Sequence, residues 1–150
     1  EADKQALANE MLPHLDFRKS GKGENTNDLK YLTAEAINGL KTFDDYIARN
    51  FARAQPQAAK PVVTSTYRTK ERNAQVGGIE DSHHLTGNAI DIDYYGAYGR
   101  QLVVALDKAR KKGTAVYNQL LTELFGTKDV YVLDPTNDKD HNDHIHVQFN

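Results

Sequence analysis

The stretch SHHLTGNAIDID, residues 82–93, joins two adjacent histidines to a glycine turn and a strand-like run that carries two aspartates. Near the C-terminus the stretch HNDHIHVQF, residues 141–149, holds three more histidines, so five of the six histidines lie in these two segments. Neutral imidazole and carboxylate are side chains that bind divalent zinc. The clustering therefore predicts a metal site that is assembled from both segments.

Two predicted strands carry the candidate ligands. Residues 88–94 alternate, so their aspartates share one face and their isoleucines share the other. In residues 144–149 both histidines share a face with Gln148. Three protein ligands and one open position are typical of a catalytic zinc. The spacing of His84 and Asp91 does not by itself specify a metal, and an ordinary polar surface remains the alternative at this point.

Composition narrows the class of protein. A chain of 150 residues with 39% hydrophobic content is enough for one domain with a real core. The formal net charge of −2 gives no reason to expect nucleic acid or an anionic membrane as partner. Because there is no cysteine, any zinc must be held by His, Asp or Glu, which favours a catalytic site. No apolar run approaches the roughly 20 residues of a membrane span, and the start of the chain does not resemble a signal peptide. We expect a soluble monomer.

Periodicity predicts four helices and four strands. Thr33 is a candidate N-cap, with Leu32 and Ile37 placed as a hydrophobic staple, and Gly113 and Gly126 are candidate C-caps. The predicted helices cover residues 2–11, 33–54, 102–112 and 114–125, the strands cover 62–67, 88–94, 130–133 and 144–149, and 17–28 is predicted as a loop. We therefore expect an α+β domain, in which a small antiparallel sheet has helices packed on one side and the metal at its exposed face.

Four motifs carry a resemblance to a known family. They are TSTYRT at 64–69, NAQVGG at 73–78, S-x-H-x-x-G-x-A-x-D at 82–91 and H-x-x-H-x-H at 141–146. In order and spacing they resemble the zinc D-alanyl-D-alanine carboxypeptidases. The wider group of these peptidases, M15, includes L-alanyl-D-glutamate and other peptidoglycan endopeptidases, and its fold is shared by the hedgehog signalling domain. The resemblance covers about residues 62–149 and implies a single zinc peptidase domain over 1–150, with a helical N-terminal part at 1–60 that contributes no motif.

The resemblance also assigns the metal ligands. It implies one zinc ion per chain, bound by His84, Asp91 and His146, with His141 as the general base. A base need not bind the metal itself, since it only takes the proton of a water molecule and passes it to the leaving amine. The same spacing assigns the metal to His84 rather than to its neighbour His83.

Three further residues are assigned around the ligands. The resemblance implies that Arg68 binds the substrate carbonyl or carboxylate, for which a planar, permanently charged guanidinium is suited. His144 would then support the ligands or the transition state. Ser82 is expected at the substrate-binding site, where a hydrogen bond would orient the His84 loop. A surface role at a strand end is the alternative for Arg68.

The function that this resemblance implies is zinc-dependent hydrolysis of a peptide bond in peptidoglycan, by a carboxypeptidase or an endopeptidase. Its place would be outside the cytoplasm, in the periplasm, in the cell wall or secreted, or in a phage lysis or virion protein. The alternative is a non-catalytic zinc module of the hedgehog type that binds a protein partner. The presence of both Arg68 and His141 favours the enzyme.

Other polar residues are expected to have structural roles. His14 has no ligand-spaced partner and is predicted to lie at the surface. Asp93 shares the face of Asp91, where a salt bridge or support of the ligands is expected. The loop 134–143 resembles a calcium loop in composition, but a loop that begins at Asp138 lacks the glycine at position six and the glutamate at position twelve. We predict a solvated loop that positions His141.

Overall fold

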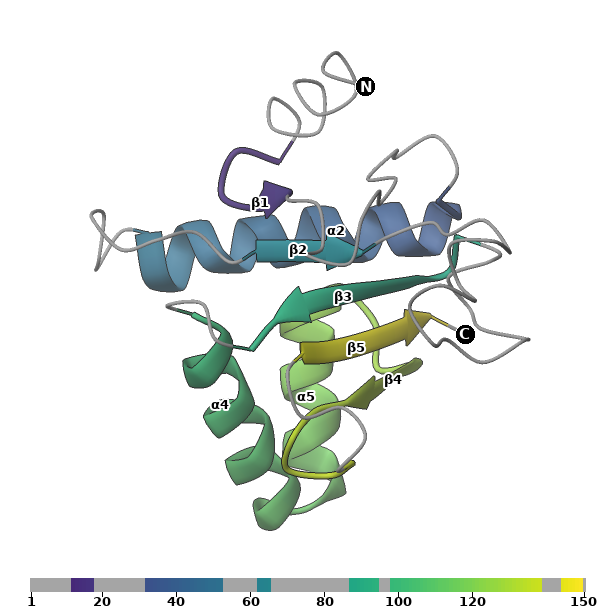
Figure 1. Ribbon diagram of the computed structural model, residues 1–150. Coiled ribbons are helices and arrows are strands. Elements are labelled where there is room, and N and C mark those ends of the chain that lie inside the picture. Colours follow the sequence, from purple (N-terminus) through teal and green to yellow (C-terminus); the bar gives the residue numbers. More distant parts are fainter. Residues whose placement is uncertain are drawn as a thin grey trace.

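Strand β3 (Ala89–Asp93) lies at the centre of a five-stranded sheet with the order β1-β2-β3-β5-β4 (Figure 1). The protein is represented by a computed structural model that describes residues 12–17, 32–52, 62–65, 87–94, 98–138 and 144–149. The other strands of this part are β1 (Asp16–Phe17), β2 (Val62–Ser65), β4 (Val130–Leu133) and β5 (His144–Phe149).

The sheet is antiparallel except at one edge. The pairs β2–β3, β3–β5 and β5–β4 are antiparallel, whereas the two-residue strand β1 runs parallel to β2. The predicted α+β class with a small antiparallel sheet is confirmed. Strand β1 was not predicted, and its Phe17 falls at the start of the segment that was predicted as a loop. A two-residue pairing depends on a distant partner strand and leaves little local pattern.

The helices begin and end close to the predicted positions. Helix α2 (Ala34–Ile47) starts at Thr33, whose hydroxyl accepts a hydrogen bond of 3.2 Å from the amide of Ala36, and it continues as the π-helix η2 (Ala48–Ala52). Helix α4 (Gly99–Lys112) and helix α5 (Thr114–Phe125) follow β3. Helix α5 ends at Gly126, which adopts the left-handed conformation with φ 80°.

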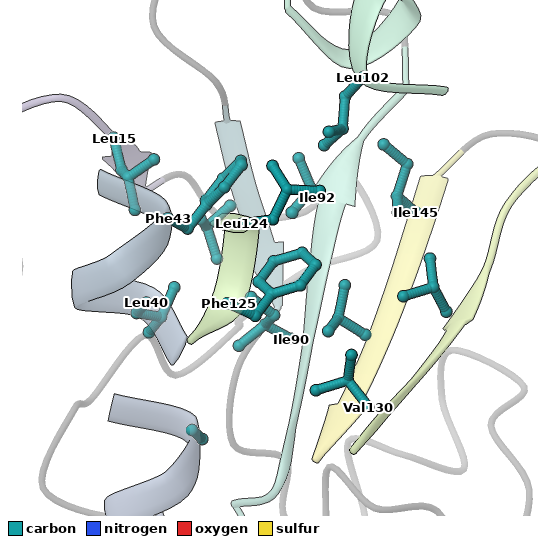
Figure 2. Close-up of a cluster of buried hydrophobic side chains, with 14 of the residues drawn as sticks. Leu15, Leu40, Phe43, Ile90, Ile92, Leu102, Leu124, Phe125, Val130 and Ile145 are labelled. Carbon is teal, nitrogen blue, oxygen red and sulfur yellow. The ribbon is translucent and has the colours of Figure 1, made fainter. Parts of the chain in front are cut away.

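One face of the sheet packs against the helices. The isoleucines of β3 and Ile145 of β5 are fully buried in one cluster with side chains of α2 and α5 (Figure 2). Val147 and Phe149 of β5 are buried in the same cluster. Helix α5 packs against both α2 and α4, and the last two also contact β5. In Figure 1 α2 and α5 lie behind the sheet, so the prediction of helices packed on one side is confirmed.

Helix α2 approaches the sheet closely at Gly39. A Cβ atom added at this glycine would overlap the ring of Phe149. That ring meets the ring of Phe125 edge to face, with 6.2 Å between the ring centroids. Gly39 therefore fixes how near α2 can lie to β5, and larger side chains at this position would push the two apart.

Several predicted segments lie outside the described residues. They are the helix at 2–11, most of the loop at 17–28 and the last two residues of the strand at 62–67. Within the described ranges, no helix is both long and apolar enough to cross a lipid bilayer.

Candidate metal centre

Asp91 of β3 and His146 of β5 face each other directly across the sheet. They are Cα partners in the antiparallel ladder, and His146 Nδ1 lies 2.9 Å from Asp91 Oδ1. Both are buried, with relative exposures of 4% and 9%. They point away from the helices because the isoleucines on either side of Asp91 enter the core. The predicted alternation along β3 and β5 is thus confirmed, and the two polar faces coincide.

The second nitrogen of His146 also faces an oxygen. His146 Nε2 lies 3.0 Å from Oε1 of Gln148, two residues further along the same strand face. A neutral imidazole carries a single N–H, so it can donate to only one of these two oxygens. The other ring nitrogen presents a lone pair, which is the group that a divalent metal needs from histidine.

His144 completes the described part of the site. Its Nε2 lies 3.8 Å from the same Oδ1 atom of Asp91 that approaches His146. One buried carboxylate therefore lies between two imidazoles, and nitrogen with carboxylate oxygen is a donor set that zinc accepts. His144 is the Cα partner of Asp93, so the second aspartate lies one row away from the Asp91–His146 row.

The ladder continues from these residues onto β4. Leu133 is the Cα partner of His146, and Tyr131 is the Cα partner of Gln148. Paired residues in an antiparallel ladder lie on the same face of the sheet. Sequence reasoning did not single out either residue for the site. The alternation of Val130 and Val132 with Tyr131 could have indicated that β4 also has an outward face.

Only part of the predicted site falls within the described residues. Asp91, His144 and His146 are described, and they lie close together. Outside the described residues lie Arg68, Ser82, His83, His84 and His141. In the part of the chain that the structure describes, no three His, Cys, Asp or Glu side chains form a metal-binding group, so the third ligand stays a prediction.

The segment that bears His84 is held at its C-terminal end. Gly87 has φ 71°, a conformation that glycine adopts without strain, and its carbonyl accepts a 3.0 Å hydrogen bond from the amide of Thr33. Asn88 binds in both directions: its Oδ1 accepts a 2.7 Å hydrogen bond from the Thr33 hydroxyl, and its Nδ2 donates to the carbonyl of Phe149. The turn into β3 is therefore fastened to the start of α2 and to the end of β5.

The segment that leads toward His141 is held by a buried ion pair. Arg110 Nη2 lies 2.6 Å from Oδ2 of Asp134, which is fully buried. Burial lowers the pKa of Arg110, but its hydrogen bonds to Asp134 and Tyr117 outweigh burial, and the pKa is raised overall. The other oxygen of Asp134 accepts a 2.7 Å hydrogen bond from the amide of Thr136. The prediction that this loop is solvated is wrong at Asp134, because a partner 24 residues away on α4 compensates for its burial.

The structure describes two other polar residues for which structural roles were predicted, His14 and Asp93. His14 is half-buried, and its amide donates a 2.7 Å hydrogen bond to Asp44 Oδ1 while its Nδ1 lies 3.3 Å from Oδ2. It therefore joins the N-terminal segment to α2 rather than lying free at the surface. Asp93 is also half-buried and shares the face of Asp91, as predicted.

Comparison with known protein families gives a match that covers more than half of the chain. A family profile described as Peptidase M15 matches residues 34–120, which is 87 of the 150 residues and more than half of the chain. The chain belongs to the peptidase M15 family. Peptidases of this family generally depend on zinc. The resemblance found in the motifs is thereby confirmed at the level of the family.

Some candidate residues of this M15 family member lie inside the matched range and others lie beyond it. It includes Arg68, Ser82, His84 and Asp91, and it ends before β4 and β5. The histidines of the C-terminal segment lie beyond the matched range, and in the structure His146 contacts Asp91, which lies inside it. No curated protein matches the chain.

Proposed function

We propose that this M15 family member is a zinc peptidase that hydrolyses a peptide bond in the stem or cross-link peptides of peptidoglycan. The observation that supports it most is the Asp91–His146 pair, a carboxylate and an imidazole 2.9 Å apart on the face of the sheet away from the helices. Family membership supports the reaction type. The peptidoglycan substrate rests on the resemblance of the motifs.

One zinc ion would be held by Asp91 and His146 with His84 as the third ligand. The described pair fits the metal, since it offers a carboxylate oxygen and a histidine with a lone pair on one ring nitrogen. When bound, zinc lowers the pKa of a water molecule and polarises the scissile carbonyl. Gln148 would hold the imidazole ring of His146 in a fixed orientation.

The remaining groups of the chain would move the proton and bind the substrate. His141 would accept the proton of the attacking water and deliver it to the leaving amine nitrogen. Arg68 would donate paired hydrogen bonds to the carbonyl oxygen or to a terminal carboxylate. His144, 3.8 Å from Asp91, would stabilise that carboxylate or the developing oxyanion. Ser82 would orient the loop before β3 at the substrate-binding site.

The substrate sets the location. Peptidoglycan lies outside the cytoplasm, so the enzyme would act in the periplasm, in the cell wall, as a secreted protein or as part of a phage. We propose that it acts as a monomer.

Digestion of purified peptidoglycan, followed by mass analysis of the released fragments, tests this function. Release of single D-alanine residues would identify a carboxypeptidase, and release of larger fragments would identify an endopeptidase. Elemental analysis of the purified protein should give about one zinc per chain. A protein that holds zinc but releases nothing from any muropeptide would contradict the enzyme and favour the hedgehog-like binding module.

Two neighbouring histidines supply a matched control. His84→Ala is expected to lose both zinc and activity, whereas His83→Ala is expected to keep both. Undiminished zinc in His84→Ala would remove His84 from the site. Equal losses of zinc and activity in both variants would mean that any change in the segment 82–88 disturbs the site. They would not support His84 as the specific zinc ligand.

A further inference from the structure

Tyr131 is an exposed aromatic residue on a strand that is otherwise built for burial. It lies between Val130 and Val132, both of which enter the hydrophobic core, while 51% of Tyr131 is exposed. Among the described residues the other large apolar side chains with comparable exposure are Val104 and Val116, which lie on helices. Tyr131 is therefore the one such residue that the described part places on the sheet.

The register of the sheet brings Tyr131 next to the candidate metal centre. Its Cα partner is Gln148, whose side-chain oxygen lies 3.0 Å from His146 Nε2. Two residues along β4, Leu133 is the Cα partner of His146 itself. Cβ atoms of directly opposed residues lie about 4.5–5.5 Å apart in an antiparallel sheet. Tyr131 and Leu133 thus form an apolar border along the β4 side of the Asp91–His146 row.

Neither packing contacts nor protection of the sheet edge explains the exposed ring of Tyr131. Within the described residues its ring pairs with no other aromatic ring and its hydroxyl makes no hydrogen bond. Edge strands are commonly protected by polar groups. On β4 a polar side chain other than Tyr131 covers one carbonyl, because Asn137 Nδ2 donates a 2.9 Å hydrogen bond to the carbonyl of Val132. The ring of Tyr131 is left to face solvent beside the site.

We propose that Tyr131 and Leu133 form a subsite that binds an apolar or long aliphatic side chain of the peptide substrate, next to the scissile bond. The inference rests on the proposed function, since it takes the peptide as the occupant of this face. A tyrosine ring offers a large, rigid apolar surface that loses little conformational freedom on binding. The apolar border lies directly beside the residues that would hold the metal. A peptide positioned for cleavage at the metal would therefore have part of its length over Tyr131 and Leu133.

A panel of synthetic stem peptides tests the subsite. In each peptide one side chain near the scissile bond is replaced by glycine, and kcat/KM is compared with that of the intact peptide. For the parent protein, replacement of the bound side chain should lower kcat/KM by about tenfold or more, as is usual for apolar pockets. In Tyr131→Thr the same replacement should change kcat/KM by less than about twofold, because the two changes remove the same contact. Threonine is chosen since it keeps the β-propensity of the position.

Controls separate this role from a structural one. Tyr131→Phe keeps the ring and should keep the discrimination between the two peptides. Val116→Thr changes an exposed apolar residue of α5 and should leave the whole panel as in the parent. Zinc content and melting temperature should match the parent in all three variants.

Three outcomes would overturn the inference. One is that Tyr131→Thr retains the full discrimination of the parent at every position. Another is that Tyr131→Thr loses zinc and shows an equal fall in kcat/KM for every peptide, which would indicate a structural role. If the parent cleaves no peptide, the proposed function fails, and calorimetric binding of the same panel decides on Tyr131 separately. Equal affinity of the parent and Tyr131→Thr in that measurement would reject the subsite.

Discussion

The hydroxyl of Thr33 donates a 2.7 Å hydrogen bond to the side-chain oxygen of Asn88, a residue 55 positions away. The same hydroxyl oxygen accepts the amide of Ala36 as the N-cap of α2. One small side chain therefore caps the start of α2 and holds the turn into β3. The N-terminal part carries no motif of the family resemblance, yet it bonds Gly87 and Asn88 at the start of β3.

Replacement of Thr33 should therefore lower the free energy of unfolding by more than the loss of a helix cap alone would. Thr33→Ala removes the cap and leaves Asn88 without its donor, and we expect the free energy of unfolding to fall by about 1–3 kcal/mol. Urea denaturation measures this change. Thr42→Ala is the matched control, because the hydroxyl of Thr42 makes only an exposed hydrogen bond, to the carbonyl of Asn38 in its own helix. A loss of less than about 0.5 kcal/mol is expected there; equal losses would contradict the special role of Thr33.

The two aspartates of β3 should differ in their effect on zinc. Asp91→Asn keeps the size of the side chain but removes the charge that faces both His144 and His146. We expect this variant to lose most of its zinc by elemental analysis. Asp93→Asn, one row away on the same face, should keep about one zinc per chain. Full zinc in Asp91→Asn, with the fold intact by circular dichroism, would argue against ligation by Asp91.

Removal of the proposed base should separate turnover from metal binding. His141→Ala is expected to keep its zinc and to lose activity by about 10²–10⁴-fold, the usual contribution of a general base. Asp143→Asn in the same segment shows whether a carboxylate serves this purpose instead. Wild-type turnover in His141→Ala, together with the large loss in Asp143→Asn, would transfer the role to the carboxylate.

The guanidinium of Arg68 should matter by its shape as well as by its charge. Arg68→Lys keeps the charge but loses the planar fork, so kcat/KM is expected to fall by about ten- to a thousandfold with zinc content and folding unchanged. Kinetics on a peptidoglycan-derived peptide give the measurement. Arg49→Lys should have no effect, because Arg49 of η2 only makes an exposed ion pair with Asp45 of α2. Parent-like turnover in Arg68→Lys would remove Arg68 from the substrate site.

The ion pair that holds the β4–β5 loop should be important for stability. Arg110→Ala would leave the buried carboxylate of Asp134 without its cation, and we expect a loss of about 3 kcal/mol in the free energy of unfolding. This is the low end of the usual range, because about a fifth of the Arg110 side chain is exposed. Arg49→Ala breaks an exposed pair and should cost at most about 0.5 kcal/mol. Comparable losses in the two variants would mean that the Asp134 pair adds nothing beyond a surface pair.

Local pattern was sufficient to predict most of the described elements. The sequence predicted α5, β4 and β5 with the bounds that the structure has, and α2 from its Thr33 cap. Helical spacing, glycine caps and strand alternation lie within a few residues of each other, so they can be read without knowledge of the fold. The alternation also predicted that Asp91 and His146 would each leave the core, and the motifs predicted the family.

Contacts between distant residues were decided by the tertiary structure. That Asp91 faces His146, 55 residues away, depends on which strands pair and in what register, and neither strand carries that information alone. The same reason explains why the two-residue strand β1 was missed and why Asp134 was expected in solvent. A carboxylate can be buried only where a partner lies within hydrogen-bonding distance, and Arg110 reaches it by the packing of α4, not by its place in the sequence.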